Sequence, residues 1–282
     1  MDKTIKTIEF DGKEYTKLAL HGGGGSMLGH YVSFFEKLGI LNDIKSFEIP
    51  VVTSSAGSLA VFFNVMKHFK KDACFGHIFD LLQEECANVL DNLDKKSVIS
   101  CAFLESLITN DDNLSPMCDI TFGDLKNINT YLEWTVCCST FNNGRYSTHT
   151  FGTHTPDVLV WKAVLASASL PVIFEAVEIN GSLYCDGDIS DWVAHLNIQD
   201  APEYLHITAT PPDYNMLFDN YTEIPLVDEM LKFLYYSIVN NFRKTRATNV
   251  LIADVRGEIS RNFLSKEYRN SGQKMAEKLV LK

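Results

Sequence analysis

A strand, a serine-rich turn and a helix follow one another in residues 47–69, which read FEIPVVTSSAGSLAVFFNVMKHF. The pattern predicts a strand over 47–53 and a helix over 56–69. The same order occurs upstream, where a short strand is expected over 15–20, a run of four glycines follows, and helical spacing extends from about 28 to 38. Strands that alternate with helices pair in parallel through crossover connections, so we expect an α/β layered fold.

The rest of the chain continues this alternation. Two helices, split near 91–96, are expected over 75–109, and single helices over 158–168, 226–242 and about 265–281. Further strands are expected over 131–140, 204–208 and 249–254, and a short one ending at 184–185. No repeat, low-complexity tract or long polar linker interrupts the pattern, so we expect one domain over 1–282, with its core at about 15–281.

The composition excludes several classes of protein. Of the 282 residues, 46% are apolar and 22% are charged, which excludes intrinsic disorder and collagen-like structure. The net charge of −11 argues against a nucleic-acid partner and weakens electrostatic attraction to anionic lipids. A membrane would have to be met through apolar contacts.

The sequence also indicates where the protein acts. None of the seven cysteines forms a Cys-x-x-Cys pair, and the first six residues lack the apolar run of a secretory signal. The uncharged run at 49–66 is interrupted by polar residues, glycine and proline, so it predicts a strand, a turn and a helix and not a membrane span. We expect a reduced, cytoplasmic or otherwise intracellular protein with no signal peptide or transmembrane helix.

The glycine run HGGGGSMLG at 21–29 admits several interpretations. A nucleotide-phosphate loop would need a lysine where His30 stands, and a dinucleotide fingerprint would need a third glycine where Met27 or Leu28 stands. The remaining choices are a plain turn and an oxyanion loop, in which glycine N–H groups approach a reacting oxygen beside a helix N-terminus. We favour the oxyanion loop, because four consecutive glycines lie between a strand and a helix.

The turn TSSAGS at 53–58 is close to the strand–turn–helix elbow that presents a nucleophilic serine. Ser55 would stand at its apex and Gly57 two residues later, whereas Thr53 occupies a position where glycine is usual. A plain N-cap serine explains the turn equally well in isolation. The glycine loop upstream makes the nucleophile the stronger interpretation.

A nucleophilic serine needs a base. None of the eight histidines lies in a recognisable triad signature, although His154 and His195 are the nearest candidates by sequence context. Asp186 is the better candidate, because a strand would deliver its carboxylate into the turn DGD at 186–188. A structural Asp-Gly turn is the alternative interpretation.

Taken together, these motifs resemble the patatin-like phospholipases. The resemblance is carried by LAL at 18–20 with GGG at 22–24, by TSSAGS at 53–58 and by DG at 186–187. The connecting segments TFGDL at 121–125 and ASASLP at 166–171 agree with it, as does the stretch from 249 to about 281. The resemblance covers roughly residue 15 to the C-terminus, and it implies a three-layer α/β/α fold with a mostly parallel central sheet.

The resemblance also implies roles for particular residues. Ser55 would be the nucleophile and Asp186 the base of a Ser–Asp dyad. The N–H groups of Gly23, Gly24 and Gly25 would form the oxyanion hole. The elbow would be supported by three further small residues, namely Ala56, Gly57 and Gly187.

The chain departs from the family pattern at three places. Ser26 and Met27 stand where the family commonly has Arg or Lys and then Gly, Thr53 replaces an elbow glycine, and Asp188 stands where a second glycine often follows. These departures concern the efficiency of catalysis more than the resemblance to the family.

The expected function is that of a lipid acyl hydrolase of the phospholipase A type, acting on fatty-acyl esters of phospholipids or acylglycerols through an acyl-serine. A phospholipid or another lipid ester is the expected partner, with peripheral membrane contact. No acidic cluster has calcium-loop spacing, so we expect no metal and no cofactor. Two alternatives stay open: an inactive patatin fold that binds lipids or partners, and an esterase or thioesterase on small soluble acyl substrates.

Overall fold

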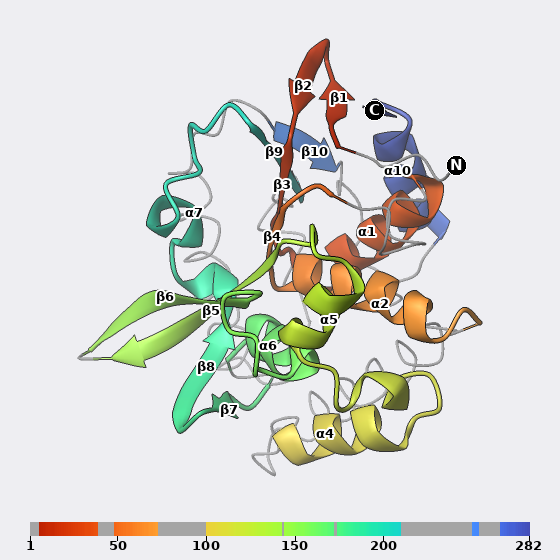
Figure 1. The fold of residues 1–282 in the computed structure, drawn as a ribbon. Helices are drawn as coiled ribbons and strands as arrows, with labels where there is room; N and C mark the ends of the chain where they lie inside the picture. Colours follow the sequence, from red (N-terminus) through yellow and green to blue (C-terminus); the bar gives the residue numbers. More distant parts are fainter. Residues whose placement is uncertain are drawn as a thin grey trace, which may run out of the picture.

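A mixed sheet of eight strands forms the centre of the computed structural model, which describes residues 6–38, 48–72, 100–142, 144–171, 174–209, 250–253 and 266–282. The strand order is β10-β9-β3-β4-β5-β8-β7, with β6 paired to β5. Figure 1 shows helices on both sides of this sheet. The bounds of the strands are β3 Lys17–Leu20, β4 Val51–Ser54, β5 Trp134–Asn142, β6 Arg145–Gly152, β7 Val177–Ile179, β8 Ser182–Asp186, β9 Tyr204–Ala209 and β10 Val250–Ala253.

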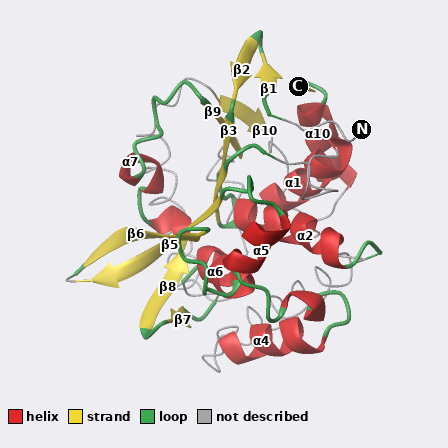
Figure 2. Ribbon diagram, in the orientation of Figure 1, coloured by secondary structure: helices red, strands yellow, loops and turns green. Residues whose placement is uncertain are grey.

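One half of the sheet is parallel and the other half is antiparallel. Strands β10, β9, β3, β4 and β5 pair in parallel, as the alternation of strands and helices predicts. Strands β6 and β8 pair antiparallel with β5, and β7 pairs antiparallel with β8. The β5–β6 hairpin extends away from the helices (Figure 2). The α/β fold with a mostly parallel central sheet is therefore confirmed, with an antiparallel edge on one side.

Side chains alternate between the two faces of the sheet. Leu18, Leu20 and Val51 belong to the large core, whereas Ala19 and Val52 belong to a smaller cluster with Trp192. The large core lies under α1 (Gly24–Leu38), α2 (Ala56–Phe69) and α6 (Val160–Ala168), and the smaller cluster lies under α7 (Trp192–His195). This alternation with period two is what buries a strand on both faces.

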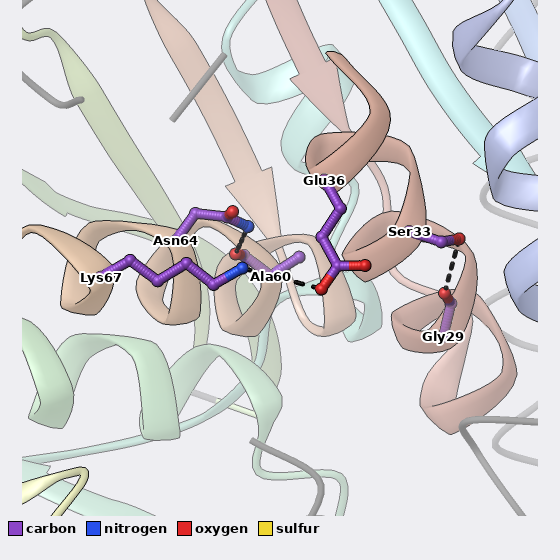
Figure 3. Close-up of polar contacts among 6 residues, drawn as sticks. All are labelled: Gly29, Ser33, Glu36, Ala60, Asn64 and Lys67. Carbon is purple, nitrogen blue, oxygen red and sulfur yellow. Dashed lines mark hydrogen bonds and ion pairs between the residues drawn. The ribbon is translucent and has the colours of Figure 1, made fainter. Parts of the chain in front are cut away.

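Helices α1 and α2 are joined by packing and by polar contacts (Figure 3). Lys67 of α2 forms an ion pair of 3.7 Å with Glu36 of α1. Two buried polar side chains donate to carbonyl groups of their own helix: Ser33 to Gly29 and Asn64 to Ala60. Because of these bonds, the donor groups of Ser33 and Asn64 keep a hydrogen-bond partner although both side chains are buried between apolar helix faces.

A small sheet lies apart from the main one and contains both ends of the described chain. Its order is β11-β1-β2, with bounds β11 Leu279–Leu281, β1 Ile8–Phe10 and β2 Lys13–Tyr15. Lys282 adds ion pairs to Glu9 and Glu14. The helix expected over about 265–281 therefore ends earlier: α10 (Lys266–Ala276) stops, and the chain returns as a strand.

Most of the other expected elements are present with shifted ends. The helix expected over 56–69 has these bounds in the structure, and that expected over 158–168 begins two residues later, at Val160. Helix α1 begins at Gly24, inside the glycine run, and not at about 28. Strand β4 is shorter than the expected 47–53. The remaining α-helices of the described residues are α4 (Cys101–Asn110), within the expected 75–109, and α5 (Phe122–Ile128), while the expectations at 75–99 and 226–242 lie outside the described residues.

Candidate active site

Ser55 stands in a strained turn between β4 and α2. Its backbone has φ 48° and ψ −122°, a conformation that residues with a side chain rarely adopt. Its N–H donates to the Ser167 hydroxyl of α6 over 3.0 Å, and its side chain is 93% shielded from solvent. The turn directs the hydroxyl away from the strand at the N-terminus of α2, where the helix dipole is positive.

A buried network of polar side chains supports the Ser55 turn. Thr53 accepts hydrogen bonds from the indole N–H of Trp134 and from the Ser58 hydroxyl, each over 2.9 Å. Ser58 lies 2.9 Å from Ser167, which donates to the carbonyl of Cys137 on β5. Thr53, a departure from the family pattern, is therefore a fully buried hydrogen-bonding centre.

Asp186 lies beside Ser55 because of the register of β5. β6 pairs along one edge of β5, and on the other edge Ser54 pairs with Cys137 and Asp186 pairs with the next residue, Cys138. The Ser55 hydroxyl donates to Asp186 Oδ2 over 2.7 Å, although the two residues are 131 positions apart in the sequence. The other oxygen, Oδ1, accepts from the N–H of Asp188 over 2.9 Å. The two residues expected to form a dyad are thus in direct contact.

The environment of Asp186 favours its neutral form. Burial, and to a smaller extent the neighbouring charge of Asp188, raise the pKa of this carboxyl to about 8. Hydrogen bonds from the Asp188 N–H and from Ser55 oppose that shift. A carboxylate with such a pKa is a far stronger base than an ordinary aspartate, and it is matched to a reaction near neutral pH.

The glycine loop lies directly against the serine. A Cβ atom on Gly22 would lie 2.6 Å from Ser55 Cβ, so only glycine permits this approach. Gly23 has φ 138°, which also favours glycine, and Gly24 and Gly25 form the first turn of α1. The first N–H groups of a helix have no acceptor within the helix, and they are positively polarised.

Two further glycines permit close packing around the elbow. A Cβ on Gly57 would lie 2.6 Å from the carbonyl oxygen of Leu20, and one on Gly187 would lie 2.2 Å from that of Cys137. Both distances are shorter than a side chain tolerates, so α2 and the turn after β8 can approach the sheet only with glycine at these positions. Ala56, the third supporting residue, is buried at the start of α2.

The two histidines considered as bases lie elsewhere. His154 contacts Thr150 of β6, and His195 is exposed at the end of α7. In the described part of the chain, the hydrogen-bond partner of the Ser55 hydroxyl is Asp186.

A buried histidine pair lies behind the glycine loop. His206 Nε2 contacts the Ile198 carbonyl, which only accepts, so His206 Nδ1 accepts the proton of His21 Nε2 over 3.0 Å. Burial lowers the pKa of both residues, that of His21 farthest, which favours neutral rings. The ring of His21 packs against Trp192, with centroids 4.8 Å apart.

The sequence motifs did not reveal Ser167 or the histidine pair as part of the site. Ser167 lies in the segment ASASLP, whose agreement with the family pattern was the one available signal. Met27, a departure in the glycine loop, is completely buried in the large core. This departure is therefore explained by packing under α1.

Neither a metal site nor a membrane-spanning helix is present among the described residues. Those residues contain no group of three or more His, Cys, Asp or Glu side chains placed to hold a metal ion. Within the same ranges, every helix is too short or too polar to cross a lipid bilayer.

An α/β fold with a buried hydroxyl–carboxylate pair at a strand–turn–helix elbow is typical of acyl hydrolases. A model of the family described as patatin-like phospholipase matches residues 44–193 of this chain. The chain belongs to the patatin-like phospholipase family, a family of lipid hydrolases. No curated protein sequence matched this chain.

Two solved structures are similar to the chain in fold. VipD from Legionella pneumophila is 13% identical with a TM-score of 0.44, over 100% of this chain and 72% of that one. The heterodimeric complex ExoU-SpcU from the type III secretion system of Pseudomonas aeruginosa is 14% identical with a TM-score of 0.39, over 95% of this chain and 53% of that one. The chain thus spans between about half and three quarters of the length of these structures.

Proposed function

We propose that the chain is a lipid acyl hydrolase of the phospholipase A type, with Ser55 as nucleophile and Asp186 as general base. The 2.7 Å hydrogen bond from the Ser55 hydroxyl to Asp186 Oδ2, at a strained turn, carries this proposal. The substrates are fatty-acyl esters of phospholipids or acylglycerols. Family membership supports the lipid class of the substrate.

The first half of the reaction forms an acyl-serine. Ionised Asp186 accepts the Ser55 proton while the hydroxyl oxygen attacks the ester carbonyl, and the carbonyl electrons move to the oxygen. When this tetrahedral intermediate collapses, the bond to the leaving alcohol breaks and the alcohol takes the proton from Asp186. The fatty acyl group then remains on Ser55.

The second half of the reaction releases the fatty acid. Asp186 accepts a proton from a water molecule, whose oxygen attacks the acyl carbonyl. Collapse of the second intermediate breaks the bond to Ser55, which takes back the proton. One carboxylate therefore serves as base and acid in both halves, and no histidine is required.

The glycine loop supplies the donors for the negative oxygen of both intermediates. The Ser55 N–H is already bonded to Ser167, so it is directed away from this role. The proposed donors are the backbone N–H groups of Gly23, Gly24 and Gly25, which follow Gly22, the residue packed against Ser55, and lead into the N-terminus of α1. Loss of one such donor costs a factor of about 10²–10³ in rate in related chemistry.

We place the reaction at a lipid–water interface inside a cell. The net charge of −11 disfavours a purely electrostatic attachment to anionic lipids, so the contact would be apolar. A jump in rate when a short-chain substrate forms micelles would support this placement. An equal rate on monomeric esters would favour an esterase of small soluble substrates.

Two variants test the roles of the dyad. Ser55→Ala removes the nucleophile and Asp186→Asn removes the base, so each should lower fatty-acid release from mixed phospholipid vesicles by about 10³-fold or more. Ser182→Ala, at the exposed start of β8, is the matched control and should keep full activity. Circular dichroism would check that each variant is folded.

The results also separate the proposal from its alternatives. Hydrolysis that persists in purified Ser55→Ala would contradict the assignment of the nucleophile. A wild-type protein that binds these vesicles without releasing any fatty acid would be a lipid-binding module.

A further inference from the structure

Asp188 is a second buried carboxylate within the candidate active site. Its backbone N–H donates to Asp186 Oδ1, and its own Oδ1 accepts from the indole N–H of Trp192 over 3.1 Å. Its carboxylate also contacts the side chain of Ser54 and the backbone of Gly22. The dyad mechanism leaves this residue without a role.

The position of the Asp188 carboxylate is set by the close approach of three segments. A Cβ atom on Gly22 would lie 1.8 Å from Asp188 Oδ2 and 2.6 Å from Ser55 Cβ. Asp188, Gly22 and Ser55 therefore meet around one point, which has no room for a side chain on the loop. The Asp188 carboxylate thus fixes the position of Gly22, the residue that precedes the proposed oxyanion donors.

We propose that Asp188 is a positioning residue, whose carboxylate holds Gly22 in place and whose negative charge controls when Asp186 is able to accept the Ser55 proton. This inference rests on the proposed function of the dyad. Asp188 does not touch the reacting oxygen in this account. It acts through the loop and through its charge.

The positioning part of the role follows from the hydrogen bonds. Gly22 joins β3 to Gly23, where the chain turns into α1. The hydroxyl of Tyr31 in α1 lies 2.7 Å from the carbonyl of His21 and 2.8 Å from that of Ile207 and shares its one proton between them, so the same junction is tied to β9. Asp188 and Tyr31 thus hold two successive residues, Gly22 and His21, at the start of the glycine loop.

The charge of Asp188 can affect the ionisation of Asp186 because both carboxylates are buried, so solvent does not screen their repulsion. The groups that face Asp188 from other elements are Ser54, Tyr31, Cys137 and Trp192, and His21 packs against Trp192. The groups that face Asp186 are Ser55 and two thiols, Cys138 and Cys185. Burial lowers the pKa of His21 and raises the pKa of Tyr31 and of these thiols, so all of them are neutral.

No cation offsets the two carboxylates within the described ranges, where the ion pairs involve other residues. Burial raises the pKa of Asp188 as well, but its contacts with Ser54, the Trp192 indole N–H and the Gly22 backbone oppose that shift and stabilise its ionised form. The charge of Asp188 therefore makes ionisation of Asp186 harder, as in other pairs of buried carboxyl groups.

The variant Asp188→Asn removes this charge and keeps an oxygen that accepts hydrogen bonds. In the wild type, kcat/KM should rise with pH through a midpoint near 8, the pKa of Asp186. In Asp188→Asn the midpoint should fall by about one pH unit or more, because the repulsion is gone. A residue with a purely structural role would change the rate and leave the midpoint in place.

Asp191→Asn is the matched control, since it removes a nearby carboxylate that caps α7 instead of facing the dyad. Its midpoint should equal that of the wild type. A midpoint in Asp188→Asn that stays within about 0.3 pH units of the wild type would overturn the inference. If Asp188→Asn does not fold, Trp192→Phe removes one donor to Asp188 and should lower the midpoint in the same direction by a smaller amount.

A second readout works without turnover. The infrared band of protonated carboxyl groups, assigned to Asp186 by its loss in Asp186→Asn, should titrate at a lower pH in Asp188→Asn than in the wild type. An unshifted band would overturn the inference even if the enzyme is active. If instead Ser55→Ala hydrolyses lipids like the wild type, the proposed dyad fails, and the band still decides whether Asp188 controls Asp186.

Discussion

The backbone of Ser55, at φ 48° and ψ −122°, has a conformation that costs of order 1–3 kcal/mol for a residue with a side chain. The surrounding structure maintains it through the bond from the Ser55 N–H to Ser167 and through the start of α2 at Ala56. The strain and the buried carboxylate are both expensive for stability. Their presence at one point supports a functional site, because selection for stability alone would remove them.

The loss of folding stability that the site causes can be measured at Asp186. Its pKa in the folded protein is about 8 against an ordinary value of 3.8, so the folded state keeps a proton that the unfolded state loses. Its contribution to stability is therefore present below about pH 4 and is lost as the pH rises through 8. Asp186→Asn cannot ionise, so at pH 8 it should be more stable than the wild type by about 1–3 kcal/mol.

Urea unfolding of both proteins between pH 5 and pH 8.5 measures this difference. The advantage of Asp186→Asn should grow with pH, whereas Asp191→Asn should show no such trend. The buried pair His21–His206 has lowered pKa values and destabilises both proteins equally at acid pH, so it does not affect the comparison. A variant that is less stable than the wild type at pH 8 would contradict the account of Asp186.

At the scale of elements, β4, the elbow and α2 are joined by the polar network centred on Thr53. Thr53→Val keeps the shape of the side chain but leaves the Trp134 indole N–H and the Ser58 hydroxyl without this acceptor. Buried donors left without partners cost about 1–3 kcal/mol, so the free energy of unfolding should fall by that amount.

Thr53→Ser is the matched variant, because it keeps the hydroxyl and loses one methyl group. It should lose about 1 kcal/mol or less and keep its activity on lipid vesicles. Equal losses in the two variants, measured by urea unfolding, would show that the hydroxyl does not support the elbow.

The sequence predicted those elements whose patterns are local. Helix α2 has the expected bounds, because a serine turn starts it and an apolar face continues to Phe69. The start of α1 was wrong by four residues, since glycine has a low helix propensity and only the tertiary setting makes Gly24 and Gly25 helical. The predicted C-terminal helix was longer than the observed one. Its last residues form β11 instead, because this strand is stabilised by pairing with β1, which is distant in sequence.

Among the site residues, Ser55 and Asp186 were predicted and do lie in contact, while their catalytic roles stay predictions. Their motifs are local, but their contact depends on β5, along one edge of which the end of β4 and the end of the antiparallel β8 pair with successive residues. The network through Ser167 and the contacts of Asp188 with Gly22 arise only when distant segments meet. Periodicity and motif spacing carry no information about such contacts.

At the scale of the whole molecule, the sheet brings two helix N-termini and two carboxylates to one place. The parallel half of the sheet directs β3 and β4 toward α1 and α2, and the antiparallel half returns β8 with Asp186 at its end (Figure 1). The positive N-termini of α1 and α2 and the carboxylates of Asp186 and Asp188 thus all lie close to Ser55. The central claim is that this arrangement makes the Ser55 hydroxyl reactive as a nucleophile.

Reaction with a fluorophosphonate probe, followed by intact-mass analysis, tests that claim most directly, because the probe needs a serine activated by its site and no knowledge of the natural lipid. The wild type should gain the mass of one probe on Ser55, and both Ser55→Ala and Asp186→Asn should gain none under the same conditions. Ser182→Ala should react like the wild type. Absence of labelling in the folded wild type, or equal labelling in Ser55→Ala, would contradict the account.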